Sequence, residues 1–350
     1  MSGGEADAKV KKRKSHATPI GSVLILAGFL GTSTLAVAHL LNVPIESALK
    51  EASMLFGALV ELITGTSTFA VGSVPNFSVD AVVFMMFSFA IFVVLWIVRL
   101  TLIEPLTAWS LGLGDKKVNF SLAKFSQVFT DAVVYGLSFS IGLRVVLSQS
   151  WVWPSANWWE GYSNGDHMFM RADFRCYYLM YTARYFQDFW SLFLHKRRKD
   201  FWQMLSHHVL TVAVGAVSYT FSFNRIGAVV MVLHDPSDVL LNSGKCLIYI
   251  NNVAKRPLYK FITNRIFEVF AVVFFTTKLI LFGYVCWSAH IESLPFFPHG
   301  VPEWSCVAFL YGLLALQFWW FGLIVKLAMN MGKDTGATDV RSSSESEKED

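Results

Sequence analysis

An uninterrupted apolar stretch runs from Ala81 to Val98 without one charged side chain. A helix needs about 20 mainly apolar residues to cross the hydrocarbon core of a bilayer, so this stretch predicts a membrane span. A second stretch covers Ser305–Val325, and a third lies at about Ile20–Leu41. The third follows a basic tail and has no small-residue cleavage site, so we expect an anchored helix, not a signal peptide. These segments indicate a membrane protein.

The composition agrees with this interpretation, because 54% of the residues are hydrophobic and only 15% are charged, against about 25% charged in soluble domains. The net charge of +4 comes from short basic clusters between apolar segments, which argues against nucleic acid as a partner. The four cysteines show no CxxC spacing. They therefore predict neither a disulfide framework nor a zinc site.

Five further segments are apolar but carry polar residues, and we expect them to span as well. They are about 127–148, 174–194, 205–223, 226–250 and 263–287. Eight spans agree with the positive-inside rule, because one set of loops holds clusters such as Lys9–Lys14 and Lys196–Lys199, whereas the opposite set holds only Lys50, Arg171 and Arg225. The count places both termini in the cytosol.

Met54–Val74 is a ninth apolar candidate, but it contains Glu61 and several Gly, Ser and Thr residues. Counting it would move the basic N-terminal cluster across the membrane, so we expect a luminal or interfacial helix. Four tryptophans of the next luminal loop predict an interfacial aromatic belt. They are Trp151, Trp153, Trp158 and Trp159.

Ionisable side chains inside a span are costly, so each needs a buried partner, a water-filled cavity or a chemical role. His207 and His208 lie near the start of the fifth span, with Thr211 one turn after His207. Adjacent helical residues are about 100° apart, so we expect the two imidazoles to face different directions.

The next span contains the motif His-Asp-Pro-Ser-Asp, which begins at His234. His234 and Asp238 are one turn apart, Asp235 is three residues before Asp238, and Lys245 lies two turns further on roughly the same face. Pro236 is expected to break the backbone hydrogen bonding, which membrane helices tolerate where they line a cavity. Antiparallel packing of the two spans would bring both clusters into one buried space.

Three interpretations of these clusters remain. The groups could satisfy one another as polar contacts between helices, or two His and two Asp could ligate zinc or iron. No HxxxH or HxxHH motif is present, which excludes a membrane di-iron desaturase. We favour acid–base or nucleophilic chemistry, because imidazole accepts a proton or an acyl group near neutral pH and a carboxylate can fix its tautomer.

Other charged residues in the spans receive a structural interpretation. Arg184 and Asp188 are one turn apart and predict a buried ion pair. Arg265, Glu268 and Lys278 in the seventh span are interpreted in the same way, with Lys278 and Arg144 as candidates for a phosphate or carboxylate contact.

The chain resembles the ceramide synthases of the TLC family of membrane proteins through their Lag motif. The likeness covers about residues 118–330, and the pairing of HH with HDxxD is specific to the synthase branch. The matching residues are Arg198-Lys199-Asp200-Phe201, His207-His208, Thr211, Arg225-Ile226-Gly227, Leu233-His234-Asp235-Pro236-Ser237-Asp238 and Lys245, flanked by Tyr177-Tyr178-Leu179 and Val272-Val273-Phe274-Phe275.

The resemblance implies an all-α polytopic membrane protein of about eight transmembrane helices, the last six forming a barrel around a membrane cavity in the endoplasmic reticulum. It implies sphingosine N-acyltransferase activity, in which a sphingoid base (sphinganine or phytosphingosine) and a fatty acyl-CoA give ceramide and CoA. No cofactor is implied, because acyl-CoA is a substrate. Expected partners are membrane lipids and a homodimer, a heterodimer or a small accessory subunit.

The resemblance also implies roles for residues. His207, His208, Asp235, Asp238 and His234 are the expected catalytic set. We expect His207 to attack the thioester and form an acyl-imidazole that the amine then opens, with Asp238 orienting that imidazole; direct attack by the amine with His207 or His208 as general base is the alternative. No metal is expected. The expected substrate-binding residues are Lys245, Arg198, Lys199, Tyr177, Tyr178, Arg225 and Thr211.

The expected organisation has four regions: a disordered basic cytosolic tail at 1–17, an N-terminal transmembrane region at 18–117, the TLC domain at 118–330, and a disordered acidic, Ser-rich cytosolic tail at 331–350. The short connection 104–126 leaves no room for the homeobox-like insert of many animal members, which suggests a fungal- or protist-like member. The alternative function is a non-catalytic TLC-family lipid-binding or translocon-associated protein. Acidophilic-kinase patterns predict phosphorylation at Ser342, Ser344 and Ser346.

Overall fold

The computed structural model describes residues 20–66, 72–111, 122–194 and 200–330. Within these ranges the regular structure is helical, apart from an isolated β-bridge between Ser73 and Met170. The α-helices are α1 (Ile20–Leu40), α2 (Ile45–Thr64), α3 (Phe77–Val98), α4 (Glu104–Ser110), α5 (Leu122–Leu147), α6 (Ala172–Ser191), α7 (Phe201–Thr220), α8 (Asn224–Ala254), α9 (Pro257–Phe274), α10 (Phe282–Trp287) and α11 (Val301–Asn330). The remaining turns are π-helices η1 (Arg99–Ile103), η4 (Phe275–Leu281) and η5 (Ser288–Glu292), and 3-10 helices η2 (Ser155–Trp158) and η3 (Asp166–Met168).

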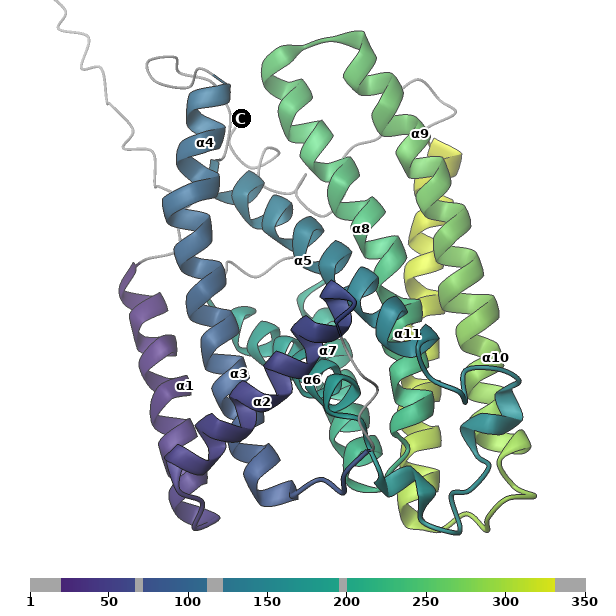
Figure 1. The fold of residues 1–350 in the computed structure, drawn as a ribbon. Coiled ribbons are helices and arrows are strands. Elements are labelled where there is room, and N and C mark those ends of the chain that lie inside the picture. The colour runs from purple at the N-terminus through teal and green to yellow at the C-terminus, as the bar shows by residue number, and fades with distance from the viewer. Residues whose placement is uncertain (1–19, 67–71, 112–121, 195–199, 331–350) are drawn as a thin grey trace, which may run out of the picture.

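The helices form an elongated bundle, with the α8–α9 connection at one end and the segments 148–171 and 293–300 at the other (Figure 1). We call the latter the loop end. Five helical segments of the described chain are long and apolar enough to cross a membrane. They are Ile20–Leu40, Phe77–Ser110, Leu122–Leu147, Pro257–Glu292 and Val301–Met329. The chain is therefore an all-α polytopic membrane protein.

A helix occupies each of the eight segments predicted to span, with ends that differ by a few residues. The three of these outside the apolar set are α6, α7 and α8, which carry most of the buried ionisable residues of the described chain. A polar helix can lie at membrane depth when its neighbours supply partners and shield it from lipid. The crossing number of eight stays a prediction.

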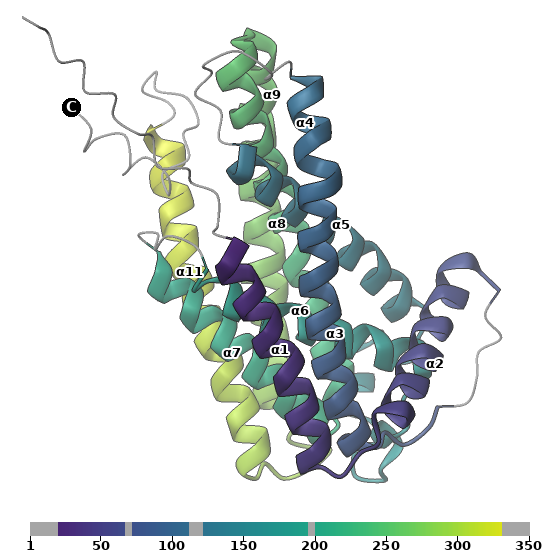
Figure 2. The same cartoon turned by 90° about the vertical axis from the view of Figure 1, so that its left-hand side faces the viewer.

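The expected helix at Met54–Val74 is wrong in its bounds, because α2 begins at Ile45 after Pro44 and ends before Gly65. Gly65 takes a left-handed conformation (φ 77°), which favours glycine and terminates the helix. The buried residues of α2 fall on one side of the helix, against α3 and α6. The helix lies obliquely on the outside of the bundle (Figure 2), and α3 starts again at the loop end.

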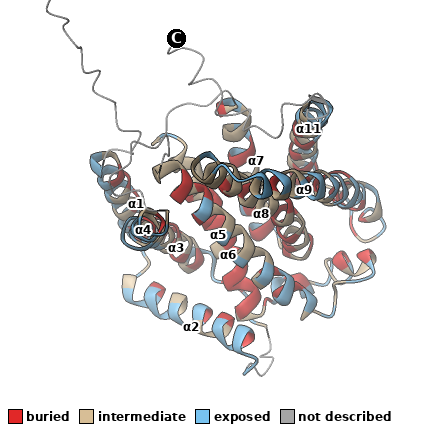
Figure 3. Ribbon diagram, turned by 90° about the horizontal axis from the view of Figure 1, so that it is seen from above, coloured by how far each residue is buried: buried red, intermediate tan, exposed pale blue. Residues whose placement is uncertain are grey.

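Helix α6 lies inside the bundle and is the most completely buried of the described helices (Figure 3). Its buried polar groups have partners on other helices: the Arg175 guanidinium contacts the carboxylates of Asp80 on α3 and of Glu51 on α2, the latter at 2.7 Å. The Tyr219 hydroxyl donates to the same Asp80 at 2.5 Å. Helices α2, α3, α6 and α7 are thus held together by one buried charged cluster.

Aromatic residues close the loop end. Trp158 and Trp159 are 5% and 3% exposed and pack against Tyr284 and Phe297. The predicted aromatic belt is therefore wrong for these two tryptophans, because they fold inward over the bundle, whereas Trp153 is 69% exposed. Folding inward places them at one end of the internal cavity described below.

Candidate active site

The two adjacent histidines of α7 face two different cavities. His207 lines the first cavity and His208 the second, and their ring centroids are 5.6 Å apart. Both side chains are buried, and neither Nδ1 atom has a hydrogen-bond partner among the described residues. The expected divergence of the two imidazoles is confirmed. The His pair forms the wall at which the two cavities meet.

The first cavity is apolar and extends from His207 toward the loop end. It has a volume of about 800 Å³ including its open mouth. Helices α6, α7, α8 and α11 supply most of its wall. Tyr181, Tyr185, Thr211 and His234 surround the His207 end, and Val214, Val230, Val307 and Leu310 are among the aliphatic residues beyond them. A largely apolar cavity with two imidazoles at the His207 end suits a long acyl chain with a reactive head.

The second cavity is polar and lies on the other side of the His pair, between α3, α5, α6 and α7. Its volume is about 930 Å³. Asp131, Asp188, Asp200, Arg184 and His208 are among its lining residues. Among the described residues, three carboxylates and one guanidinium line this cavity, and carboxylates favour a cationic ligand.

His234 has a defined tautomer. Its Nδ1 lies 2.8 Å from the carbonyl oxygen of Val230, and a carbonyl can only accept, so Nδ1 carries the proton in the neutral ring. Nε2 is therefore the basic nitrogen, and it is buried without a hydrogen-bond partner among the described residues. His234 lines the first cavity together with His207. The geometry prepares this ring to accept a proton.

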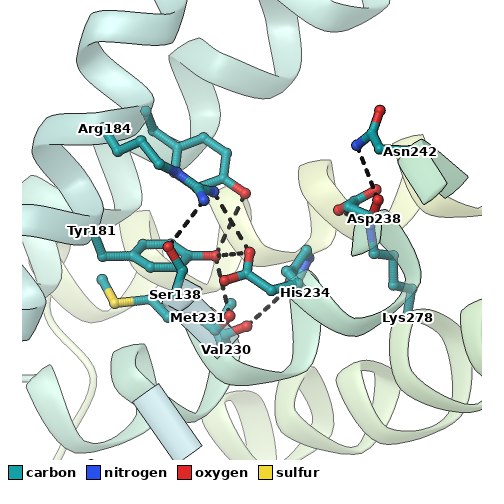
Figure 4. A network of polar contacts seen from close by, with 11 residues as sticks. Ser138, Tyr181, Arg184, Val230, Met231, His234, Asp238, Asn242 and Lys278 are labelled. Carbon is teal, nitrogen blue, oxygen red and sulfur yellow. Dashed lines mark hydrogen bonds and ion pairs between the residues drawn. The ribbon is translucent and has the colours of Figure 1, made fainter. Parts of the chain in front are cut away.

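Asp235 is held by α6. Its side chain is 0% exposed, and its Oδ1 lies 3.5 Å from a terminal nitrogen of Arg184 and accepts the Tyr181 hydroxyl at 3.0 Å (Figure 4). Arg184 also donates to the Ser138 hydroxyl and stacks on the ring of Tyr185. The expected Arg184–Asp188 pair is wrong, since the ion pair that forms with Arg184 joins two helices through Asp235. The second carboxylate oxygen, Oδ2, has no partner among the described residues.

Asp238 is paired with a lysine from another helix. Lys278 lies on the π-helical segment η4, and its buried ammonium group is 2.7 Å from Asp238 Oδ2 (Figure 4). A hydrogen bond from an imidazole to a carboxylate is absent from the described residues, so the expected orientation of His207 by Asp238 has no support in this geometry. α8 continues through Pro236 without ending, and Pro236 supplies no backbone N–H at that position.

The other predicted substrate-binding residues are dispersed. Thr211 and Tyr178 line the first cavity. The Thr211 hydroxyl donates to the backbone carbonyl of His207, and the Tyr178 hydroxyl forms a hydrogen bond with the Ser218 hydroxyl. Tyr177 is buried and its hydroxyl has no hydrogen-bond partner among the described residues. Arg225 donates to the carbonyl groups of 157 and 160 at the loop end, far along α8 from His234.

Some predictions lie elsewhere. Lys245 is half-buried on α8, almost two turns beyond Asp238, and lines neither cavity. Arg198 and Lys199, the phosphorylation sites Ser342, Ser344 and Ser346, and both predicted disordered tails lie outside the described residues. Their roles stay predictions.

Sequence reasoning missed the functional weight of Arg184 and Tyr181, and it named Lys278 as a candidate for a carboxylate contact without identifying Asp238 as the partner. Arg184 and Tyr181 were visible as polar residues of one span, and Lys278 as an isolated cation in another. Each joins the site through a contact with an Asp on α8. The signal available in the sequence was that a buried cation in a membrane needs an acidic partner.

The fold and site together define a polytopic membrane protein with a histidine pair between an apolar and an acidic internal cavity. Residues 124–326 match the TLC domain family, more than half of the chain, and the chain belongs to that family. The matched range lies within the predicted domain at 118–330 and includes both cavities apart from Leu95 of α3.

Named relatives come from animals, fungi and plants. The chain is 32% identical over 227 residues to ceramide synthase 4 of Mus musculus, covering 63% of this chain and 54% of that protein. It is 29% identical over 216 residues to sphingosine N-acyltransferase lag1 of Schizosaccharomyces pombe, with 57% and 54% covered. Ceramide synthase LOH2 of Arabidopsis thaliana is 25% identical over 277 residues, with 74% and 90% covered. The chain spans about half the length of the mouse and yeast relatives.

Proposed function

We propose that this protein is a ceramide synthase, which transfers a fatty acyl group from acyl-CoA to the amine of a sphingoid base. The observation that carries the proposal is the His207–His208 pair between an apolar and an acidic cavity. Two chemically different substrates can reach the same pair from opposite sides. The names of the relatives and the match to the TLC domain support the same activity.

The first cavity suits the acyl chain. Its aliphatic and aromatic lining removes the chain from water and gains about 0.8 kcal/mol for each buried methylene group. The thioester carbonyl would then lie beside His207 and His234. The second cavity suits the sphingoid head, because its carboxylates attract an ammonium group and its polar lining can bond hydroxyl groups.

The preferred mechanism has two steps. The neutral His207 imidazole attacks the thioester carbonyl, the C–S bond breaks, and the acyl group stays on the ring. The thiolate of CoA leaves as the thiol with the proton that the other ring nitrogen gives up. The neutral amine then attacks the acyl-imidazole, forms the amide bond and releases the imidazole. His208, which lines the second cavity and whose Nδ1 has no hydrogen-bond partner among the described groups, would take the proton of the attacking amine and pass it to the departing His207 imidazole. Direct attack by the amine with a His as general base is the alternative.

The carboxylates balance charge. Asp235 and Asp238 each pair with a cation, Arg184 and Lys278, so we assign them to holding the site together and to compensating the charge that forms on an imidazole. This role replaces the direct Asp238–imidazole contact expected from the sequence. The proposed reaction needs no cofactor. We place it in the endoplasmic reticulum membrane with both termini cytosolic.

The test uses purified wild type, His207→Ala and His39→Ala, with sphinganine and a panel of acyl-CoA esters. His39 is an exposed histidine at the end of α1 and is the matched control. Mass spectrometry of ceramide and release of free thiol are measured. We expect product from wild type and His39→Ala and at least a hundredfold loss in His207→Ala. Acyl-CoA binding without product in the wild type would refute the proposal and favour the non-catalytic lipid-binding function.

Intact-mass measurement separates the two mechanisms. Wild type given acyl-CoA without a base should gain the mass of one acyl group, and His207→Ala should not. The absence of this adduct under single-turnover conditions, with ceramide still formed when base is added, would refute the covalent route in favour of direct attack.

A further inference from the structure

The apolar first cavity ends in two polar residues at its far end. His299 and Glu303 line it beside Phe297 and Trp159, where the loop end meets the start of α11. A hydrocarbon chain has no group that could bond them, so polar side chains are unexpected at this position of an acyl cavity. Neither residue takes part in the chemistry proposed at His207.

Both side chains are fixed by neighbours. The Nε2 of His299 is 2.7 Å from the Ser293 hydroxyl, and its ring packs against Trp304 with centroids 5.0 Å apart. The Glu303 carboxylate accepts the backbone N–H of Gly300 at 2.8 Å. The Nδ1 of His299 is buried and has no hydrogen-bond partner among the described residues. One buried ring nitrogen at the end of the cavity therefore lacks a partner.

The distance between the two ends of the cavity suits a common acyl length. His207 and Ser218 line it three turns apart on α7, which is about 16 Å at 1.5 Å per residue. An extended carbon chain advances about 1.25 Å per carbon for single bonds of 1.5 Å at near-tetrahedral angles, so this distance takes about 13 carbons. The loop residues His299 and Glu303 lie beyond α7, which allows roughly 14 to 18 carbons in all.

The side chains of His299 and Glu303 together favour a hydroxyl group on the acyl chain. A hydroxyl has one proton and can also accept, so it can accept from a protonated Nδ1 of His299 while it donates to the Glu303 carboxylate, or it can donate to an unprotonated Nδ1. A terminal carboxylate on the chain would be repelled by Glu303. Burial lowers the pKa of His299, which keeps the ring neutral near pH 7 and removes the cation that would attract such a carboxylate.

We propose that His299 and Glu303 form a subsite for a hydroxyl group at the far (ω) end of the acyl chain, so that ω-hydroxyacyl-CoA is the preferred acyl donor. This inference rests on the proposed acyltransferase function. The ω-hydroxyl bonds the Nδ1 of His299, whereas an ω-methyl group leaves that nitrogen buried and unpaired. We expect a half-buried hydrogen bond of this kind to make kcat/KM about tenfold higher for the ω-hydroxyacyl ester than for the plain acyl ester.

The test compares CoA esters of straight-chain acids of 14, 16 and 18 carbons with their ω-hydroxy counterparts. The variants are His299→Phe, which keeps a ring but removes both nitrogens, and His290→Phe as the matched control. His290 bonds the Tyr311 hydroxyl and does not line the cavity. Wild type and His290→Phe should prefer one ω-hydroxy length about tenfold, and His299→Phe should lose or reverse this preference.

Each result decides a separate question. Equal or lower kcat/KM for every ω-hydroxy ester in the wild type, with ceramide formed from the plain esters, overturns the subsite and leaves the proposed function standing. A preference that survives in His299→Phe also overturns it. Failure of all esters to give ceramide refutes the proposed function and the subsite with it. If His299→Phe fails to fold, Glu303→Leu provides the same comparison, with a reduced preference expected.

Discussion

Removal of Arg184 should destabilise the protein through Asp235. The two side chains are 5% and 0% exposed, and their closest atoms are 3.5 Å apart. At an effective dielectric constant of 20 two unit charges at this distance attract by about 5 kcal/mol, and truncating one partner of a buried pair costs about 3–5 kcal/mol. Arg184→Met leaves Asp235 with only the Tyr181 hydroxyl as a hydrogen-bond donor. We expect a loss in Tm of about 4–7 °C for a chain of 350 residues.

A double-mutant cycle isolates the pair from the rest of the site. Asp235→Asn removes the charge but keeps the shape and the acceptor for Tyr181, and in this variant Arg184 retains the rings of Tyr135 and Tyr185. The double variant Arg184→Met/Asp235→Asn should be more stable than Arg184→Met alone, with a coupling free energy of about 2–3 kcal/mol. Arg265→Met is the matched control, because its ion pair with Glu268 is more than half exposed, and should shift Tm by about 1 °C or less.

Thermal unfolding in detergent, followed by intrinsic fluorescence, measures these differences. Additive losses in Arg184→Met and Asp235→Asn would refute the argument, because the two charges would then not interact. A loss in Tm in Arg265→Met equal to that in Arg184→Met would also refute the argument, because the destabilisation would then not depend on the burial of the ion pair.

The remaining predictions concern Lys278, which pairs with Asp238, and the loop residue His167. Lys278→Met should lower kcat at least tenfold with little change in the KM for acyl-CoA, because Asp238 loses its cation, and Lys278→Arg should recover most of it. Burial lowers the pKa of His167 from 6.5 to about 4. As the pH falls below 6.5, His167 is protonated in the unfolded chain but stays neutral in the folded protein. The free energy of unfolding therefore falls by about 2 kcal/mol at pH 5. His167→Gln should lose this acid dependence of Tm; an unchanged profile contradicts it.

The positions of the helices could be predicted because lipid leaves a chain few alternatives. An apolar segment such as Ala81–Val98 must satisfy its backbone groups internally, so its length alone predicts a helix. α2 was misplaced because its apolar residues occupy one side only and its limits depend on Pro44 and Gly65. A proline inside α8 did not end that helix, which shows that packing against neighbours overrides a local signal.

The residues of the site could be predicted from the sequence, but most of their contacts could not. His207 and His234 were found from the clusters at 206–211 and 234–238, and the structure brings both to one cavity. Lys245 was expected in the same buried space as Asp238, on roughly the same face of the helix, but the cation that pairs with Asp238 is Lys278. Sequence spacing describes neighbours on one helix, whereas Lys278 reaches Asp238 through the packing of η4 against α8.

The charges buried on α6 also constrain how the chain enters the bilayer. A single Arg or Asp at the centre of an isolated helix costs about 2.5–3.5 kcal/mol to insert, and α6 carries Arg175 and Arg184 among its buried residues. The carboxylate that pairs with Arg175 is on α3, which is synthesised before α6. The carboxylate that pairs with Arg184 is on α8, which is synthesised after α6. α6 can reach its final environment only when α8 has emerged from the ribosome. Biogenesis of this protein therefore requires several helices to be integrated as a group.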